Sequence, residues 1–474
     1  MKKIIVSTFF LAFLFSCKKD NKVVEKPIIE EVKEFAQFSP EITENAIIYE
    51  ANIRQYSPEG TFTQFTKDIP QLKELGVKII WLMPIFPISE TKRKATGGEN
   101  SKFASEMPEN EQKKYLGSYY AVSDFKAINP EFGTIEDFRE LVKTAHENGI
   151  YVILDWVPNH TGWDHIWLKE HPEFYTKNNK GEITHPEGTD WTDVADLDYS
   201  NEGLQKAMTE DMKYWLKNEN IDGFRCDVAG SVPTSFWQKS IPQLRKEKSI
   251  FMLAEAWEPE LLKDNLFDMC YAWDGHHVMN KIAQGENNVK NWDAYIEKRV
   301  NDYESDDILM NFVDNHDENS WNGTLNERLG DASELMIALS YLTPGMPLIY
   351  SGDEYDLNHR LKFFEKDSIP KIKGKNWDIF TKLGKIKTEK TALNGGKKSA
   401  SYKKINASLS EEILAFEREK NNEKILFIGN LSNNIQEFTI DINGAFKDLY
   451  HNNTITINKG GKIKLEPWQF LILE

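Results

Sequence analysis

Short apolar segments alternate with amphipathic segments along most of this chain. Apolar runs bounded by turn residues are typical of strands that are buried on both faces, as in parallel sheets. We predict eight such strands, at residues 47–53, 77–83, 151–157, 221–227, 250–255, 266–271, 308–313 and 346–350. Segments with helical periodicity lie between them, including one that ends near Leu75 and others at 134–148 and 203–218, and a last one at 377–390 follows the eighth strand. The alternation predicts an α/β fold, and eight strands is the number that closes a (β/α)8 TIM barrel.

Two regions depart from this alternation. Residues 158–200 lose the periodicity and are rich in Trp, His, Pro, Asn and Gly. Because a loop of this length without structure is uncommon in a compact domain, we predict a short inserted subdomain there, after the third strand. Beyond Asn394-Gly395-Gly396, short β-rich runs predict a C-terminal all-β domain over 393–474. The barrel is then expected over 41–157 and 201–392.

The first residues have the pattern of an export signal. Lys2 and Lys3 precede an apolar stretch from Ile4 to Phe15, which is too short for a permanent membrane span. The sequence Leu14-Phe15-Ser16-Cys17 resembles a bacterial lipobox, which implies cleavage before Cys17 and lipidation of that residue. We therefore predict a signal peptide over 1–17, a flexible tether over 18–40, and a cell-envelope lipoprotein on the periplasmic or surface side of the outer membrane. A plain secretory signal is the alternative.

Composition narrows the class of ligand. The 474 residues include 40% hydrophobic and 28% charged residues, as in ordinary soluble proteins, and the net charge of −17 argues against a nucleic-acid partner. Most of the 13 Trp and 17 Tyr belong in the core, although aromatic faces also stack on sugar rings. Cys226 and Cys270 lie in apolar runs and are expected to be buried, without a disulfide or metal. Contact with a membrane is expected only through the lipid anchor.

Three acidic residues lie at or just after the ends of predicted strands, at near-regular intervals. Asp227, Glu255 and Asp317 lie 28 and 62 residues apart. A barrel of eight strand–helix units uses about 30 residues for each unit, so these gaps correspond to one unit and two units. The three carboxyl groups are therefore expected at one rim of the barrel, where such barrels build their active sites.

The chemistry that suits this set is glycoside hydrolysis with retention. That reaction needs a carboxylate nucleophile and a carboxylic acid about 5 Å apart, which Asp227 and Glu255 on adjacent strand ends would provide. Arg225 shares the strand face of Asp227 and is expected to keep it ionised. Glu255 has apolar sequence neighbours, which are expected to raise its pKa, as an acid catalyst requires.

The motifs around these residues resemble a known family. Four segments are similar to the signature regions of glycoside hydrolase family 13, the α-amylase family: Asp155-Trp-Val-Pro-Asn159-His160, Gly223-Phe-Arg225-Cys-Asp227, Glu255, and Phe312-Val-Asp-Asn-His316-Asp317. Ala195-Asp-Leu-Asp198 is similar to the fifth region, 117–134 to the loop after the second strand, and 344–354 to the last strand. The resemblance covers roughly residues 45–390.

The resemblance implies a role for each site residue. Asp227 would be the nucleophile, Glu255 the acid and then the base, and Asp317 would hold sugar hydroxyls in the distorted transition state. The implied substrate-binding residues are Tyr120, which stacks on the sugar, Arg225, which orients the nucleophile, and His160 and His316, which donate hydrogen bonds.

A calcium ion is a further implication of the resemblance. In many members the residues equivalent to Asn159 and Asp196 bind structural Ca²⁺, an ion that prefers oxygen ligands. Many amylases also carry Lys-His after the nucleophile, where this chain has Gly230-Ser231. That pair contributes to the calcium site and to glucan binding in those enzymes, so this chain departs from the pattern in both respects.

The residues and the resemblance together predict a lipid-anchored, retaining α-amylase that cleaves internal α-1,4 bonds of starch-like α-glucans or maltooligosaccharides. The alternatives within the family are an α-glucosidase, a neopullulanase or a transglycosylase. An alternative of another class is a non-catalytic cell-surface glucan-binding protein, although none of the three acids is missing. The oligomeric state is left open.

Overall fold

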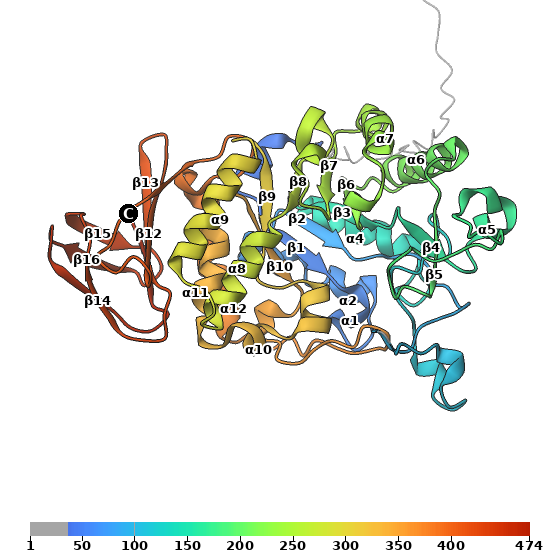
Figure 1. Ribbon diagram of the computed structural model, residues 1–474, viewed down its shortest axis with the longest axis horizontal. Coiled ribbons are helices and arrows are strands. Elements are labelled where there is room, and N and C mark those ends of the chain that lie inside the picture. The colour runs from blue at the N-terminus through green and yellow to red at the C-terminus, as the bar shows by residue number, and fades with distance from the viewer. Residues whose placement is uncertain (1–36, 99) are drawn as a thin grey trace, which may run out of the picture. The chain divides into compact units, whose positions relative to one another are not determined.

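A closed barrel of eight parallel strands forms the centre of the protein in a computed structural model, which describes residues 37–98 and 100–474 (Figure 1). The strands are β1 (Ile48–Ala51), β2 (Ile79–Leu82), β3 (Tyr151–Trp156), β6 (Gly223–Cys226), β7 (Phe251–Ala254), β8 (Met269–Tyr271), β9 (Ile308–Asn311) and β10 (Met346–Tyr350). They follow one another around the barrel in this order, and β10 pairs with β1. The predicted fold class is confirmed, because each of the eight predicted strands contains one strand of the barrel.

Helices surround the barrel strands. The longer ones are α4 (Ile135–Glu147), α6 (Glu202–Asn218), α7 (Thr234–Glu247), α8 (Trp273–Ala283), α9 (Val289–Asp302), α11 (Ser333–Leu342) and α12 (Lys375–Glu389). The helix predicted to end near Leu75 is broken into α2 (Phe62–Thr66), α3 (Ile69–Leu72) and a 3-10 turn, Lys73–Leu75. Pro70 explains the break, because it has no backbone N–H to continue the ladder from α2.

The inserted region after β3 contains a short antiparallel ribbon, β4 (His160–Gly162) with β5 (Val194–Asp196), and the helix α5 (Ile166–Glu170). The loop after β2 packs against this ribbon, since Gly162 N–H donates to Val122 O at 2.7 Å. A Cβ on Gly162 would lie 2.4 Å from the Cβ of Ser89, so glycine is required for this close approach. The ribbon and the loop are therefore fixed to each other beside the rim of the barrel.

The last part of the chain is a β domain. Its six-stranded sheet has the order β11 (Ser401–Lys404), β12 (Ile413–Lys420), β13 (Glu423–Asn430), β18 (Phe470–Leu473), β15 (Gly444–Asp448) and β16 (Asn453–Ile457). A second sheet pairs β14 (Gln436–Thr439) with β17 (Lys462–Leu465). Buried Arg418 joins the domain to the barrel, because its guanidinium donates to Leu342 O at 2.6 Å and to Asn394 O at 2.8 Å.

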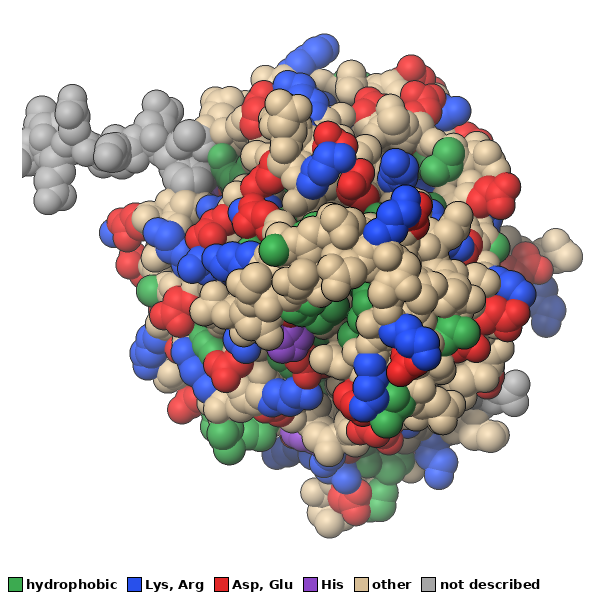
Figure 2. Space-filling model, turned by 90° about the vertical axis from the view of Figure 1, so that its left-hand side faces the viewer, with side chains coloured by type: hydrophobic (Ala, Val, Ile, Leu, Met, Phe, Trp, Pro, Cys, Tyr) green, Lys and Arg blue, Asp and Glu red, His purple; other side chains and the backbone are tan. Residues whose placement is uncertain are grey.

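Charged side chains of both signs are interspersed on the face shown in Figure 2, so basic side chains do not form one continuous patch there. Several lysines of the β domain form ion pairs with neighbouring carboxylates, such as Lys424 with Glu419 at 2.9 Å. Such exposed pairs contribute little to stability, and their consequence is a mixed surface of acidic and basic groups.

The predicted signal peptide, Cys17 and nearly all of the predicted tether lie outside the described residues. Of the tether's last residues, Phe38 is buried and contacts the rings of Tyr151 and Phe251. In the described part of the chain, no helix is long and apolar enough to cross a membrane. Cys226 and Cys270 are both buried and free, as the sequence predicts.

Candidate active site

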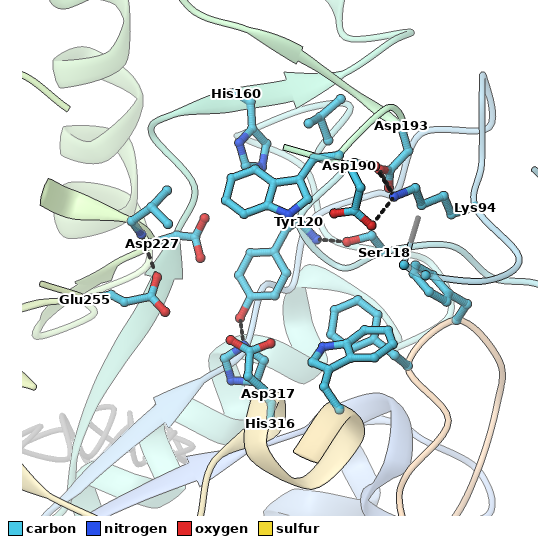
Figure 3. Close-up of a pocket in the computed structure, with 18 residues that line it drawn as sticks. Lys94, Ser118, Tyr120, His160, Asp190, Asp193, Asp227, Glu255, His316 and Asp317 are labelled. Atoms are coloured by element: carbon cyan, nitrogen blue, oxygen red, sulfur yellow. Dashed lines mark hydrogen bonds and ion pairs between the residues drawn. The ribbon is translucent and has the colours of Figure 1, made fainter. Parts of the chain in front are cut away.

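The three acids converge on one cavity at the carboxyl ends of the barrel strands. Asp227 follows β6, Glu255 follows β7, and Asp317 lies in the loop after β9. All three line a cavity of about 450 Å³ together with Tyr120, His160 and His316 (Figure 3). The structure thus brings together the three predicted catalytic acids and three of the four predicted substrate-binding residues.

Arg225, the fourth of these, lies behind the cavity wall and contacts three carboxyl groups. It is fully buried, and its Nη1 lies 2.9 Å from Asp155 Oδ1 and 2.8 Å from Asp227 Oδ1. Its Nη2 lies 2.8 Å from Glu255 Oε1. A planar guanidinium presents several donors in a fixed geometry, so this one side chain fixes the relative positions of Asp227 and Glu255.

Burial raises the pKa of both of these acids. The pKa of Asp227 rises to about 6 because its burial outweighs the opposite effect of Arg225. The pKa of Glu255 rises to about 7, again through burial, with the Arg225 guanidinium opposing the shift. The predicted rise in the pKa of Glu255 is confirmed and its neighbours Ala254 and Ala256 are buried, but the surroundings are not purely apolar, because the carboxylate also contacts Arg225 and Trp257 is 60% exposed. Arg225 limits the rise in the pKa of Asp227 but does not keep it near its ordinary value.

Val228 has a strained backbone conformation directly after Asp227. Its φ of 36° and ψ of 46° lie in the left-handed region, which is unfavourable for a β-branched residue. The strained turn directs the N–H of Val228 to Glu255 Oε2, at 2.7 Å. Strain of this kind is found at functional sites, and here it links the segment of Asp227 to the carboxylate of Glu255.

A chain of hydrogen bonds lies beneath the cavity. Glu50, buried on β1, contacts His316 Nδ1 at 2.5 Å, and His316 Nε2 lies 2.8 Å from the hydroxyl of Tyr120. That hydroxyl donates to Asp155 Oδ2 at 3.1 Å. Burial alone would lower the pKa of His316, but the carboxylates of Asp317 and Glu50 raise it to about 10. His316 is therefore an imidazolium that presents a positive charge next to Asp317.

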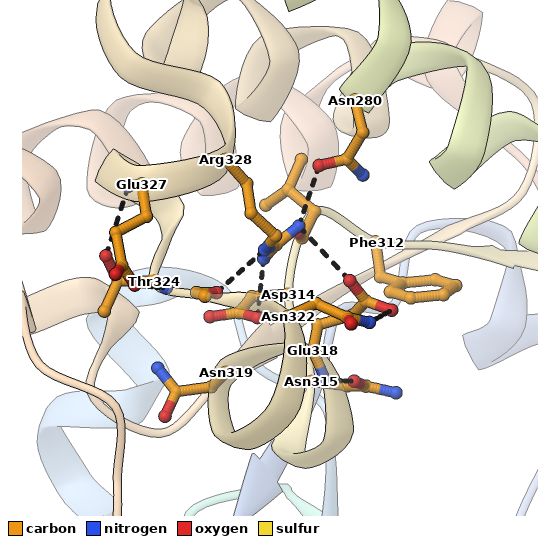
Figure 4. A network of polar contacts seen from close by, with 12 residues as sticks. Asn280, Phe312, Asp314, Asn315, Glu318, Asn319, Asn322, Thr324, Glu327 and Arg328 are labelled. Carbon is orange, nitrogen blue, oxygen red and sulfur yellow. Dashed lines mark hydrogen bonds and ion pairs between the residues drawn. The ribbon is translucent and has the colours of Figure 1, made fainter. Parts of the chain in front are cut away.

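Arg328 anchors the loop that carries His316 and Asp317 through the polar contacts drawn in Figure 4. The guanidinium of Arg328 donates to Asp314 Oδ1 at 2.7 Å and contacts Glu318 at 3.7 Å. These two contacts lie on either side of the His316–Asp317 pair in sequence, so they anchor both ends of this short segment.

His160 is buried in the wall of the cavity opposite Asp317. Burial lowers its pKa to about 4, so the imidazole is neutral at physiological pH. Its ring lies 5.6 Å from that of Trp191, another residue of the cavity lining. A neutral imidazole can donate one hydrogen bond to a sugar hydroxyl without adding charge.

The residues predicted to hold calcium are adjacent to His160. Asp196 pairs with His160 across the ribbon, and Leu197 N–H donates to Asn159 O at 3.2 Å. Within residues 37–98 and 100–474, no group of three or more His, Cys, Asp and Glu side chains is placed to hold a metal ion. The described part of the chain thus adds no such cluster to Asn159 and Asp196, and calcium binding stays a prediction.

Sequence reasoning missed several residues of this site. Glu50 is signalled only as an acidic residue inside an apolar strand, a pattern that marks a buried charge with a partner, and Asp155 only as the first residue of a signature region, without a role. The cavity is also lined by residues from distant loops, which no local pattern identifies: Lys94, Asp190, Trp191, Asp193, Trp321, Phe363 and Phe364.

The two pKa values predict a narrow pH optimum. A nucleophilic Asp227 must be ionised, so activity should rise as the pH passes its pKa of about 6. A proton-donating Glu255 must be protonated, so activity should fall as the pH passes its pKa of about 7. We expect a bell-shaped profile of kcat/KM with its maximum between these values, measured on a soluble maltooligosaccharide. A profile that is flat between pH 5 and pH 9 would contradict these assignments.

Comparisons with known proteins agree with the fold and the site. Residues 33–184 and 187–263 match the family model of the alpha-amylase catalytic domain, and residues 413–472 match that of the alpha-amylase SusG C-terminal domain. Together these two models cover more than half of the chain. The closed (β/α)8 barrel has carboxyl groups at its rim, and its sequence matches the alpha-amylase catalytic domain. Together these findings identify the protein as a glycosidase.

The chain carries the catalytic domain of the α-amylase family, glycoside hydrolase family 13. It is 25% identical to Alpha-amylase 3 of Dictyoglomus thermophilum over 91% of this chain and 93% of that protein. A noncanonic maltogenic alpha-amylase from Thermotoga neapolitana shares 28% identity over 91% of this chain and 98% of its own, with a TM-score of 0.79. A cyclomaltodextrin glucanotransferase from Bacillus sp. is 25% identical over 73% of this chain, which spans only 54% of that protein.

Proposed function

We propose that this protein hydrolyses α-1,4-glucosidic bonds of starch-like α-glucans with retention of anomeric configuration. The observation that carries the proposal is the single guanidinium of Arg225, which holds Asp227 and Glu255 at neighbouring strand ends of one cavity. Retention needs such a fixed pair of carboxyl groups, one to attack and one to donate a proton.

In the first step, a carboxylate oxygen of Asp227 attacks the anomeric carbon and the bond from this carbon to the glycosidic oxygen breaks. Glu255 gives its proton to that oxygen, which leaves as the hydroxyl of the departing sugar. In the second step, Glu255 takes a proton from water, the water oxygen bonds to the anomeric carbon, and the bond to Asp227 breaks. The raised pKa of Glu255 allows it to hold a proton before the first step and to accept one in the second.

The other residues would bind and distort the sugar. The ring of Tyr120 provides a stacking face, and its hydroxyl is fixed by Asp155 and His316. Asp317, 40% exposed beside the His316 imidazolium, can accept hydrogen bonds from two sugar hydroxyls. Neutral His160 on the opposite wall can donate a third. Hydrogen bonds that strengthen in the transition state add several kcal/mol to catalysis.

The relatives differ in the acceptor of the second step. The Thermotoga neapolitana protein is described as a maltogenic alpha-amylase, whereas the Bacillus proteins are glucanotransferases, in which a sugar replaces water as acceptor. We propose hydrolysis for this chain. We also propose that it is exported and lipid-anchored at Cys17, and this second proposal rests only on the sequence of residues 1–17.

The test is the set of products from amylose, maltoheptaose and pullulan. We expect reducing ends to increase with time and products shorter than the substrate from amylose and maltoheptaose. Cyclic products, or products longer than the substrate, would show a transglycosylase instead. Glucose as the sole product would indicate an α-glucosidase, and rapid cleavage of pullulan a neopullulanase-like enzyme.

A further inference from the structure

The loop that contains Lys94 crosses one end of the cavity and contacts both of its walls. Lys94 is 3% exposed, and its Nζ donates to Asp190 O at 2.5 Å. The same ammonium lies 3.6 Å from Asp193 Oδ1 and 3.8 Å from Asp190 Oδ2. A buried ammonium with a carbonyl and two carboxylates around it is a fixed contact, which joins the loop after β2 to the inserted subdomain.

Three residues after Lys94, at Gly97, the same loop contacts the side of the cavity that carries Trp321. A Cβ on Gly97 would lie 2.9 Å from Trp321 Cη2, so the backbone of the loop passes directly against this indole. Trp321 packs in turn against Phe363 and Phe364, with ring centroids 5.1 Å and 5.9 Å apart. We name the barrier formed by Lys94, Gly97, Asp190, Asp193 and Trp321 the end wall.

The end wall and the reacting groups lie on opposite sides of the sugar platform. In Figure 3, Asp227 and Glu255 lie on one side of Tyr120, and Lys94, Asp190 and Asp193 lie on the other. In the proposed mechanism Glu255 gives its proton to the departing sugar, so that part of the substrate would leave on the side of Glu255. The sugar attached to Asp227 would rest on Tyr120, and its remaining units, which run to the non-reducing end, would extend toward the end wall.

We propose that the end wall binds the non-reducing end of the glucan chain and limits how many units fit beyond Tyr120. The inference rests on the proposed function and replaces the expected cleavage at internal bonds with cleavage near one chain end. The cavity of about 450 Å³ is in the lower half of the range of about 300–1,000 Å³ for small-ligand pockets. The Asp190 and Asp193 carboxylates and the Lys94 ammonium offer both acceptors and donors to terminal sugar hydroxyls.

The experiment compares two forms of maltoheptaose, each labelled with a fluorophore at the reducing end. One has a free non-reducing end, and the other carries an ethylidene group there. We expect the wild type to release one short unlabelled fragment from the free form and to cleave the blocked form at least about tenfold more slowly, because the end wall leaves no space for the added group. Lys94→Met and Trp321→Ala should each bring the two rates closer together and yield unlabelled fragments of several lengths.

Lys92→Met is the matched control, because Lys92 belongs to the same loop but packs over the ring of Trp163 and does not line the cavity. It should keep the wild-type ratio of rates. Trp321→Ala, at a side chain that is 45% exposed, carries the test if Lys94→Met does not fold. Equal cleavage of both forms by the wild type would overturn the inference, as would an unchanged ratio in the folded variants. Failure to cleave even the free form would instead contradict the proposed function.

Discussion

Replacing Asp227 with Asn should lower kcat/KM for hydrolysis of maltoheptaose by about 10⁵-fold, the order of loss seen when a nucleophile is removed. The amide of Asn has almost the same shape and can still accept the hydrogen bond that Arg225 donates to Asp227 Oδ1 at 2.8 Å. It cannot form the bond to the anomeric carbon at a useful rate. Binding of maltooligosaccharide, measured by calorimetry, should therefore change little while turnover is lost.

The control for this variant is Asp441→Asn in the β domain. Asp441 is exposed in the β domain and forms an ion pair with the exposed Lys459, so its replacement should leave kcat/KM near that of the wild type. If Asp227→Asn retained activity within about tenfold of the wild type, Asp227 would not be the nucleophile.

Replacing Glu255 with Gln should lower kcat/KM on maltoheptaose by about 10³-fold, within the range for a general acid–base residue. The loss should be much smaller for the first step with an α-maltosyl fluoride, because fluoride leaves without a proton. The decrease in activity above pH 7 should also disappear from the profile, since it reflects loss of the Glu255 proton.

The exposed residue Glu260, which is not among the residues that line the cavity, provides the matched substitution Glu260→Gln. This variant should keep both the rate and the bell-shaped profile. A Glu255→Gln variant that lost the same factor on both substrates would show that Glu255 acts by holding the structure and does not donate a proton.

The barrel was predictable because each of its strands is a local apolar run. Asp227 and Glu255 were found for the same reason, as acids at the ends of such runs. The break at Pro70 shows the limit of periodicity. Phe65, Ile69, Leu72 and Leu75 have the spacing of one helix face and are all buried, although the helix is interrupted. The spacing of apolar residues thus predicted which side chains are buried, but it did not predict that Pro70 interrupts the helix.

The environment of the acids depends on contacts between residues that are distant in sequence. Glu50 meets His316, and Lys94 meets Asp190, only after the barrel and its loops have formed. The apolar sequence neighbours of Glu255 correctly predicted a pKa raised by burial, but they did not indicate the Arg225 guanidinium that opposes this rise. Local sequence thus predicted which residues meet in the cavity but not the contacts that hold them there.

The most direct test of the central claim is to trap the intermediate. An α-maltosyl fluoride with fluorine at carbon 5 of the reacting sugar slows both steps, and it should allow the glycosyl-enzyme to accumulate. Mass spectrometry of the intact protein should then show one added maltosyl group, and peptide mapping should place it on Asp227. An unlabelled protein that releases the product with inverted configuration, or a label on another residue, would contradict the account.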